Sequence, residues 1–229
     1  RILDGIALAR RTGSQMLYPR AYAEATHLLG TVRQHPDVLT AEIAGSVRPE
    51  TLVVSMAAGI TTSLLEEELP AGTHVVRVMT NTPVFVDEAM SAISPGSHAK
   101  EEHLALVEDL LRHVGRVIRV PEHQQDAVTA LSGSGPAYFF YLVEAMIDAG
   151  ILLGLPRAVA AELIVQTAVG SARMLQESDE HPVVLREAVM SPAGTTISAI
   201  RVMEDHGVRA AMLAALEAAR DRSRELAGG

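Results

Sequence analysis

The segment Met190–Thr196 has the residue types of an anion-binding turn at the start of a helix. Pro192 fixes φ and lacks an amide hydrogen, Gly194 accepts any backbone region, and apolar residues at helical spacing follow. We expect the amides of Gly194, Thr195 and Thr196 to lack intrahelical partners there, which together with the helix dipole favours a bound carboxylate. The two threonine hydroxyls can add directional hydrogen bonds. The alternative is an ordinary capped helix.

Two further loops directly follow predicted strands, at 51–55 and 74–79. In open α/β sheets ligands bind beyond the carboxyl ends of the strands, so both loops lie where a cofactor would be held. A plain Asn-Thr-Pro turn is the alternative for the second loop. The candidate cofactor contacts on these loops are Ala57, Ala58, Met79, Asn81 and Pro83.

The stretch Leu131–Tyr138, with the sequence Leu-Ser-Gly-Ser-Gly-Pro-Ala-Tyr, is the third unusual segment. Ser132 or Ser134 can cap a following helix, and the two glycines allow close approach of another backbone. It is not a dinucleotide-binding loop, because Tyr138 replaces the third glycine and no strand precedes it. A structural role in helix packing and a ligand contact both remain open.

The elements that must position these segments change in kind along the chain. Up to Pro121 the pattern predicts strands at 51–55, 74–79, more weakly 90–93, and 116–120, with helices at 61–69 and 100–114. Earlier helices are expected at 2–9, 22–29 and 37–44. Alternating strands and helices indicate a parallel or mixed sheet covered on both faces.

After Pro121 only helices are predicted, at 137–149 with breaks at Gly150 and Gly154, at 156–175 with Pro156 in the first turn, from 182, at 195–205 and at 208–226. Several are apolar on more than one face, such as Ile-Leu-Leu at 151–153. Such helices need partners all round, which predicts a dimer interface. A monomeric bundle is the alternative.

Composition excludes several classes of function. The 229 residues are 48% hydrophobic but only 3% aromatic, so the core must be aliphatic. A formal charge of −9 argues against nucleic-acid binding, and the absence of cysteine excludes disulfides and thiolate chemistry. No uninterrupted run of about 18 apolar residues indicates a membrane span, so a cytoplasmic location is expected. The spacing of His98 and His103 does not suggest a metal site.

Four segments together closely resemble pyrroline-5-carboxylate reductases, in order and in spacing. They are 53–61, 77–83, 126–138 and 191–196, and the likeness extends from about residue 37 to the end. The family joins an N-terminal Rossmann domain to an all-helical domain that interlocks into a homodimer, often assembled into a decamer. The resemblance implies an α/β plus all-α fold, with a Rossmann-like domain at 1–121 and a helical dimerisation and substrate domain at 122–229.

The family reduces 1-pyrroline-5-carboxylate to L-proline with NADPH or NADH, in the last step of proline synthesis. Carried onto this sequence, the resemblance implies that the 191–196 turn holds the substrate carboxylate and that Thr196 bonds the ring nitrogen. The implied substrate contacts are Ser191, Gly194, Thr195 and Thr196. The implied cofactor contacts are Ala57, Ala58, Met79, Asn81, Pro83 and Ser134.

The sequence departs from the family pattern near its start. Family members begin with a strand and a Gly-rich pyrophosphate loop, neither of which is found here, and residues 2–6 look like the helix that follows that loop. We expect the sequence to begin just past the loop. The alternatives are a non-catalytic dimeric homologue that has lost the loop, and an imine reductase for another cyclic substrate. Ala193 also stands where glycine is usual, a mild change.

Overall fold

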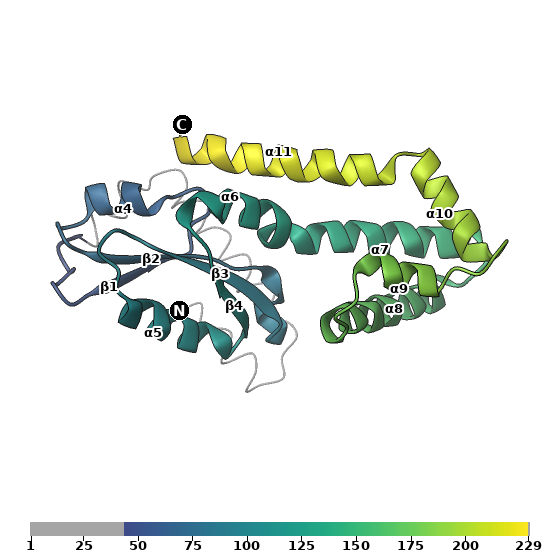
Figure 1. The fold of residues 1–229 in the computed structure, drawn as a ribbon, viewed down its shortest axis with the longest axis horizontal. Helices are drawn as coiled ribbons and strands as arrows, with labels where there is room; N and C mark the ends of the chain where they lie inside the picture. The colour runs from purple at the N-terminus through teal and green to yellow at the C-terminus, as the bar shows by residue number, and fades with distance from the viewer. Residues whose placement is uncertain (1–43, 229) are drawn as a thin grey trace. The chain divides into compact units, whose positions relative to one another are not determined.

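The computed structural model describes residues 44–228, which form two compact units. The first unit comprises residues up to 136 together with residues from 217 onward, and the second is Ala137–Leu216. Figure 1 shows the elements along the chain. The helices predicted before residue 44 and the expected start of the sequence beyond a Gly-rich loop lie outside the described residues.

The first unit is built on a four-stranded sheet in the order β1-β2-β3-β4. The strands are β1 (Leu52–Ser55), β2 (His74–Met79), β3 (Ala89–Pro95) and β4 (Gly115–Arg119). β1 and β2 are parallel, β2 and β3 antiparallel, and β3 and β4 parallel, so the predicted mixed sheet is confirmed. β3 is longer than predicted because its alanines and serines give little strand signal, yet nearly all of it is buried.

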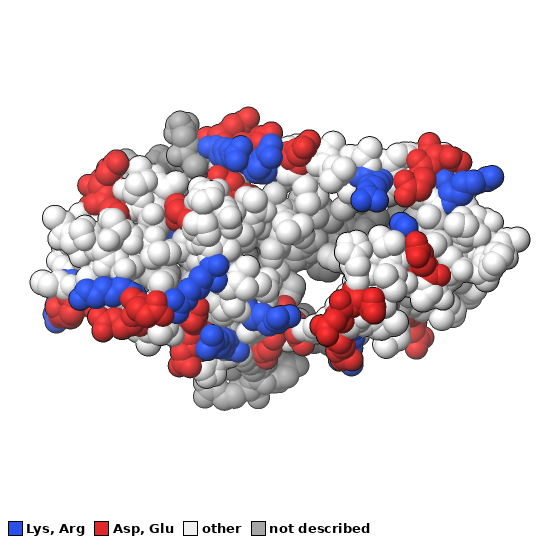
Figure 2. Space-filling model, viewed as in Figure 1, with Lys and Arg blue, Asp and Glu red and all other residues white. Residues whose placement is uncertain are grey.

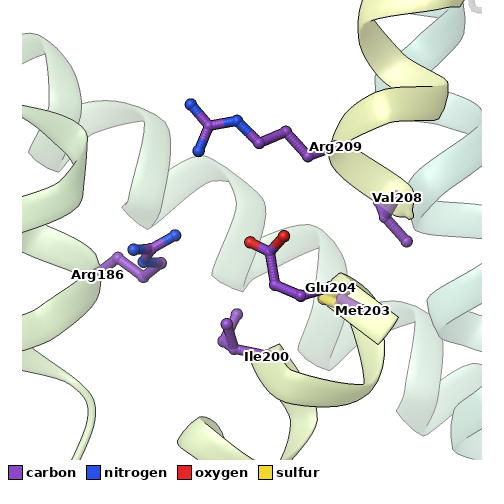
Figure 3. Close-up of a pocket in the computed structure, with 6 residues that line it drawn as sticks. All are labelled: Arg186, Ile200, Met203, Glu204, Val208 and Arg209. Atoms are coloured by element: carbon purple, nitrogen blue, oxygen red, sulfur yellow. The ribbon is translucent and has the colours of Figure 1, made fainter. Parts of the chain in front are cut away.

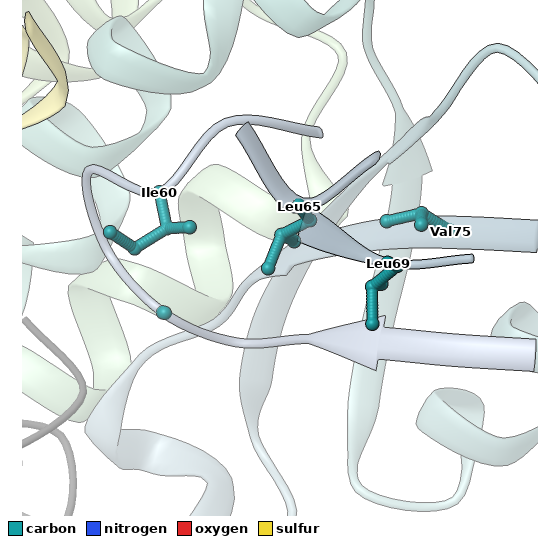
Figure 4. Packing of buried hydrophobic residues seen from close by; sticks show 5 residues of the cluster. Ile60, Leu65, Leu69 and Val75 are labelled. Atoms are coloured by element: carbon teal, nitrogen blue, oxygen red, sulfur yellow. The ribbon is translucent and has the colours of Figure 1, made fainter. Parts of the chain in front are cut away.

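Helices cover both faces of this sheet, as predicted. α4 (Thr62–Glu68) and α5 (Glu101–Arg112) belong to two separate hydrophobic clusters. Alternation along β2 distributes its side chains between them. The first cluster, part of it shown in Figure 4, is Ala57, Ile60, Leu65, Leu69 and Val75. The second is Val76, Val78, Ile93, Leu104 and Val107.

The 3-10 turn η1 (Thr82–Val86) connects β2 to β3. After β4 the chain leaves the sheet through short helical segments, η2 (Glu122–Gln124) and α6 (Gln125–Val128). The π-helical turn η3 (Thr129–Gly133) then leads into α7 (Gly135–Leu152). No strand follows Pro121 within the described residues, in agreement with the sequence pattern.

The predicted helix break at Gly150 is wrong, because α7 continues through this residue. A Cβ at Gly150 would lie only 2.8 Å from the Cβ of Ala160, so the missing side chain lets α8 approach closely. The break occurs at Gly154, whose φ of +93° is in the left-handed region that glycine favours. α8 begins at Arg157, one residue later than predicted, so Pro156 lies directly before the helix rather than in its first turn.

The remaining helices follow the predicted pattern closely. They are α8 (Arg157–Glu177), α9 (Pro182–Ala188), α10 (Thr195–Asp205) and α11 (Val208–Gly228). Pro182 occupies the first turn of α9, where the missing amide hydrogen costs no hydrogen bond. Residues of α11 from 217 onward pack with the first unit, where the hydroxyl of Ser223 donates to Asp126 at 2.7 Å.

Many apolar side chains of the helices are exposed in the single chain. Leu152 and Leu153 are 89% and 85% exposed, and Phe139, Phe140 and Tyr141 of α7 are exposed as well. The stretches Glu122–Leu152 and Arg157–Glu177 are long and apolar enough to cross a membrane by length and composition alone, a test that core helices of soluble proteins also pass. On the face in Figure 2, acidic and basic side chains are interspersed, with broad areas free of charge between them.

Candidate functional site

The two loops predicted to hold a cofactor leave the same edge of the sheet. β1 and β2 are parallel neighbours, with Ser55 opposite Arg77. The segment that follows β1, with Ala57 and Ala58, therefore leaves the sheet beside residues 79–83, which follow β2. The carboxyl ends of parallel strands are where open α/β sheets bind ligands, so this edge suits a dinucleotide.

The first loop offers its backbone rather than its side chains. The methyl group of Ala57 is buried in the hydrophobic cluster under α4, and its amide donates to the Ser55 hydroxyl at 3.4 Å. Gly59 has a φ of +80°, and a Cβ there would lie 3.1 Å from the Cβ of Leu226 on α11. This tight turn leaves the backbone around Ala58 as the surface available to a ligand.

The second loop is fixed by side-chain hydrogen bonds rather than being a plain turn. Asn81 Oδ1 accepts from the amide of Met90 at 3.0 Å, and its Nδ2 donates to the carbonyl and hydroxyl oxygens of Ser132 at 3.3 and 3.4 Å. A Cβ at Gly133 would lie 3.1 Å from the sulfur of Met79. The structure thus brings the loop after β2 into contact with the Ser-Gly stretch. Pro83 lies in the first turn of η1.

The Ser-Gly stretch begins in the π-helical turn η3 and continues directly into α7, so it is part of a helical path rather than a loop. The Ser134 amide donates to the carbonyl oxygen of Thr129 at 2.8 Å, which continues the helical path. Sequence reasoning missed this because Gly and Ser are usual in loops. π-helical turns inside α-helices occur frequently at functional sites. Ser134 follows the turn directly, close in sequence to the contact with Asn81.

The turn before α10 lies in the second unit and has the predicted form, with one correction. The Gly194 amide is not free, because it donates to the carbonyl oxygen of Ser191 at 3.0 Å. The first intrahelical acceptor is the Gly194 carbonyl, which receives the amide and hydroxyl of Ser198 at 3.4 and 3.0 Å. Within the described residues the amides of Thr195 and Thr196 have no backbone acceptor. These two donors are available to an anion.

The backbone conformation at Ala193 is one that glycine adopts more easily than alanine. Its φ is +57°, in the left-handed region that costs a residue with a Cβ about 1–2 kcal/mol. The turn therefore carries local strain directly before the Gly194 N-cap.

A cavity of about 270 Å³ in the second unit was not predicted. Arg186, Glu204 and Arg209 come from three successive helices, and Figure 3 shows their charged ends directed into the same space. The Nε of Arg186 is buried without a hydrogen-bond partner among the described residues. Ile200, Met203 and Val208 complete the lining. Because these charges are far apart in sequence or on different helices, spacing alone gave no signal for them.

Within residues 44–228 no group of three or more His, Asp or Glu side chains is placed to hold a metal ion. That the reaction uses no metal ion remains a prediction.

Comparison with known proteins relates the chain to one family. Residues 122–226 match the family model described as pyrroline-5-carboxylate reductase dimerisation. The chain is 49% identical over 188 residues to a pyrroline-5-carboxylate reductase of Corynebacterium melassecola, covering 81% of this chain and 70% of the relative.

Solved structures agree. The chain is similar to a pyrroline-5-carboxylate reductase of Coxiella burnetii, with a TM-score of 0.78 and 39% identity over 84% of this chain and 72% of that one. It is also similar to the Plasmodium falciparum pyrroline carboxylate reductase with NADP bound, with a TM-score of 0.81 and 28% identity over 85% of this chain and 78% of that one. The chain therefore belongs to the pyrroline-5-carboxylate reductase family.

Proposed function

We propose that this protein reduces 1-pyrroline-5-carboxylate to L-proline by hydride transfer from NADPH or NADH, as the last step of proline synthesis. The observation that carries the proposal is the start of α10. Within the described residues the amides of Thr195 and Thr196 have no backbone acceptor, and together with the two hydroxyls they can donate hydrogen bonds to a carboxylate. The same chain presents paired strand-end loops suited to a dinucleotide.

The loops at the sheet edge are held in place by contacts within the chain. Gly59 packs against Leu226 and Gly133 against Met79, and Asn81 holds the loop after β2 against the π-helical turn. We propose cofactor contacts from Ala57, Ala58, Met79, Asn81, Pro83 and Ser134. When bound, the cofactor supplies the hydride. The protein then has to orient the two reactants and keep water out.

The substrate turn has two tasks in this proposal. The amides of Thr195 and Thr196, with Ser191 and Gly194 shaping the turn, hold the substrate carboxylate at the positive end of the α10 dipole. The Thr196 hydroxyl oxygen accepts a hydrogen bond from the protonated ring nitrogen. Protonation favours hydride addition at the imine carbon, because the C=N electrons then end on nitrogen as a neutral amine. No side-chain acid is required for this step.

We further propose that the protein works as a homodimer in the cytoplasm and that these dimers assemble further into a decamer. The support for a dimer is the match of residues 122–226 to a dimerisation model, together with the exposed apolar side chains of α7. Light scattering after size exclusion separates monomer, dimer and decamer by mass. A membrane-bound fraction would contradict the location, and a monomer at micromolar concentration would contradict the dimer.

The division into domains at 1–121 and 122–229 also stays a proposal. The family match begins at Glu122, which supports it. Residues 122–136 and those from 217 onward nonetheless pack with the sheet unit, so the chain passes between the units at Ala137 and again at Glu217.

The reductase proposal is tested by following NADPH and NADH oxidation at 340 nm with purified complete gene product and 1-pyrroline-5-carboxylate, with L-proline identified as the product. Thr196→Ala should lower kcat/KM about tenfold or more, equivalent to about 1.4 kcal/mol of transition-state stabilisation. Thr196→Ser keeps the hydroxyl and should retain most activity. A folded dimer that oxidises neither cofactor would refute the proposal.

A further inference from the structure

One carboxylate oxygen connects the two strand-end loops. Glu122 lies in η2, which follows β4 in the chain. Its Oε1 accepts from Nη1 of Arg77 at 2.8 Å and from the backbone amide of Thr62 at 3.1 Å. Arg77 belongs to β2 just before Met79, and Thr62 begins α4 shortly after Gly59. The same atom is thus hydrogen-bonded to the strand that precedes one loop and to the helix that follows the other.

The ion pair between Arg77 and Glu122 contributes little to the stability of the fold. The side chain of Arg77 is only 2% exposed and that of Glu122 is 29% exposed, so both charges lose hydration. Within the described residues, Arg77 Nε and Nη2 and Glu122 Oε2 have no hydrogen-bond partner. A buried pair with unsatisfied atoms gains little net stability, and well-packed apolar residues often replace such pairs without loss. What an apolar pair cannot do is direct two hydrogen bonds.

The segment that carries Glu122 is held firmly against the sheet. Gln125 is fully buried, and its Nε2 donates to the Ser94 hydroxyl at 2.7 Å and the Ala92 carbonyl at 3.4 Å. This second contact fixes η2 and α6 relative to β3. The backbone at Glu122 is therefore fixed relative to the sheet. A shift of its carboxylate would move the two strand-end loops rather than η2 and α6.

We propose that Glu122 is a positioning residue for the nicotinamide dinucleotide, setting the separation of the loops at 57–59 and 79–83 through Thr62 and Arg77. This inference rests on the proposed function. It does not require contact between Glu122 and the cofactor. Its consequence is that the polar pair controls cofactor binding, while the substrate turn in the second unit is left unchanged.

The test combines binding and kinetics on the complete protein. The double variant Arg77→Met with Glu122→Leu should fold with a melting temperature within a few degrees of the native protein, because the pair is replaced by apolar groups of similar volume. Its Kd for NADPH, measured by fluorescence titration, and its KM for NADPH should rise at least tenfold. KM for 1-pyrroline-5-carboxylate should change much less. Glu122→Gln keeps an acceptor oxygen and should show a smaller rise in the same direction.

Glu108→Gln is the matched control, since this carboxylate also pairs with an arginine, Arg119, but contacts neither loop. It should leave NADPH binding unchanged. Native NADPH affinity in a folded double variant would overturn the inference, and so would equal rises in both KM values. If the double variant does not fold, the single variants Glu122→Gln and Glu122→Ala decide the question. An NADPH affinity equal to that of the native protein in both folded single variants would also overturn the inference.

The native protein separates the two proposals. NADPH binding without turnover refutes the reductase while the Kd series still decides the role of Glu122. Absence of binding to both NADPH and NADH refutes both proposals.

Discussion

Replacing Ala193 by glycine should stabilise the protein. With φ at +57°, this alanine occupies the left-handed region, where a Cβ costs about 1–2 kcal/mol. Glycine removes that cost but gives the unfolded chain more freedom, which offsets about 0.5–1 kcal/mol. The difference predicts a rise of about 0.5–1 kcal/mol in the free energy of unfolding for Ala193→Gly.

Urea denaturation at a fixed protomer concentration measures this change, because the stability of a dimer depends on concentration. The midpoint should rise with an unchanged slope, and the melting temperature should rise by about 1–4 °C for a chain of this length. KM for 1-pyrroline-5-carboxylate should stay within about threefold, since the Gly194 amide keeps its bond to Ser191. An unchanged or lower midpoint would show that the turn carries no strain at this residue.

Gly194→Ala is the opposing control in the same turn. A Cβ at this position would lie 3.0 Å from the carbonyl oxygen of Ser191 and would also collide with its hydroxyl. The turn would have to open to accept it. We expect lower stability together with a raised KM for the substrate, so the two neighbouring substitutions should shift the unfolding midpoint in opposite directions.

Three further changes test other parts of the structure. Gly150→Ala places a methyl group against Ala160, so the free energy of unfolding should fall by about 1–2 kcal/mol in urea titrations. Asn81→Ala removes the bonds to the π-helical turn and should raise KM for NADPH in steady-state assays, with unchanged NADPH affinity as the contrary result. The hydrogen bond from Arg119 holds the pKa of Glu108 below its usual value. Glu108→Gln should therefore destabilise most above about pH 4.3, and the difference should vanish as acid protonates Glu108, as unfolding against pH would show.

Local signals predicted most of the elements. The β-branched run at 74–79 and the helical spacing after Pro121 depend only on neighbours in sequence, and the structure confirms both a strand and helices there. Pro182 and Gly154 mark a helix start and a helix end through their own backbone preferences. The failure at Gly150 has the opposite cause, since a contact with another helix outweighs the weak helix propensity of glycine.

The contacts that organise the candidate cofactor site could not be predicted in the same way. Asn81 meets Ser132, and Arg77 meets Glu122, across long intervals of sequence. Nothing in the local pattern of either partner specifies the other, because a buried polar group needs only some acceptor or donor of suitable geometry. The resemblance placed the motifs in order along the chain. The structure adds which atoms of those motifs face one another.

These long-range contacts all involve the segment between β4 and α7. Glu122, Gln125 and Ser132 follow one another along it, and each bonds to a different strand or strand-end loop of the sheet. The segment therefore couples the loops at the sheet edge to each other through polar groups. The two apolar clusters instead hold α4 and α5 on the faces of the sheet. Hydrogen bonds are directional and hydrophobic burial is not. Substitutions in this segment should consequently affect cofactor affinity more than stability, whereas substitutions in the two apolar clusters should do the reverse.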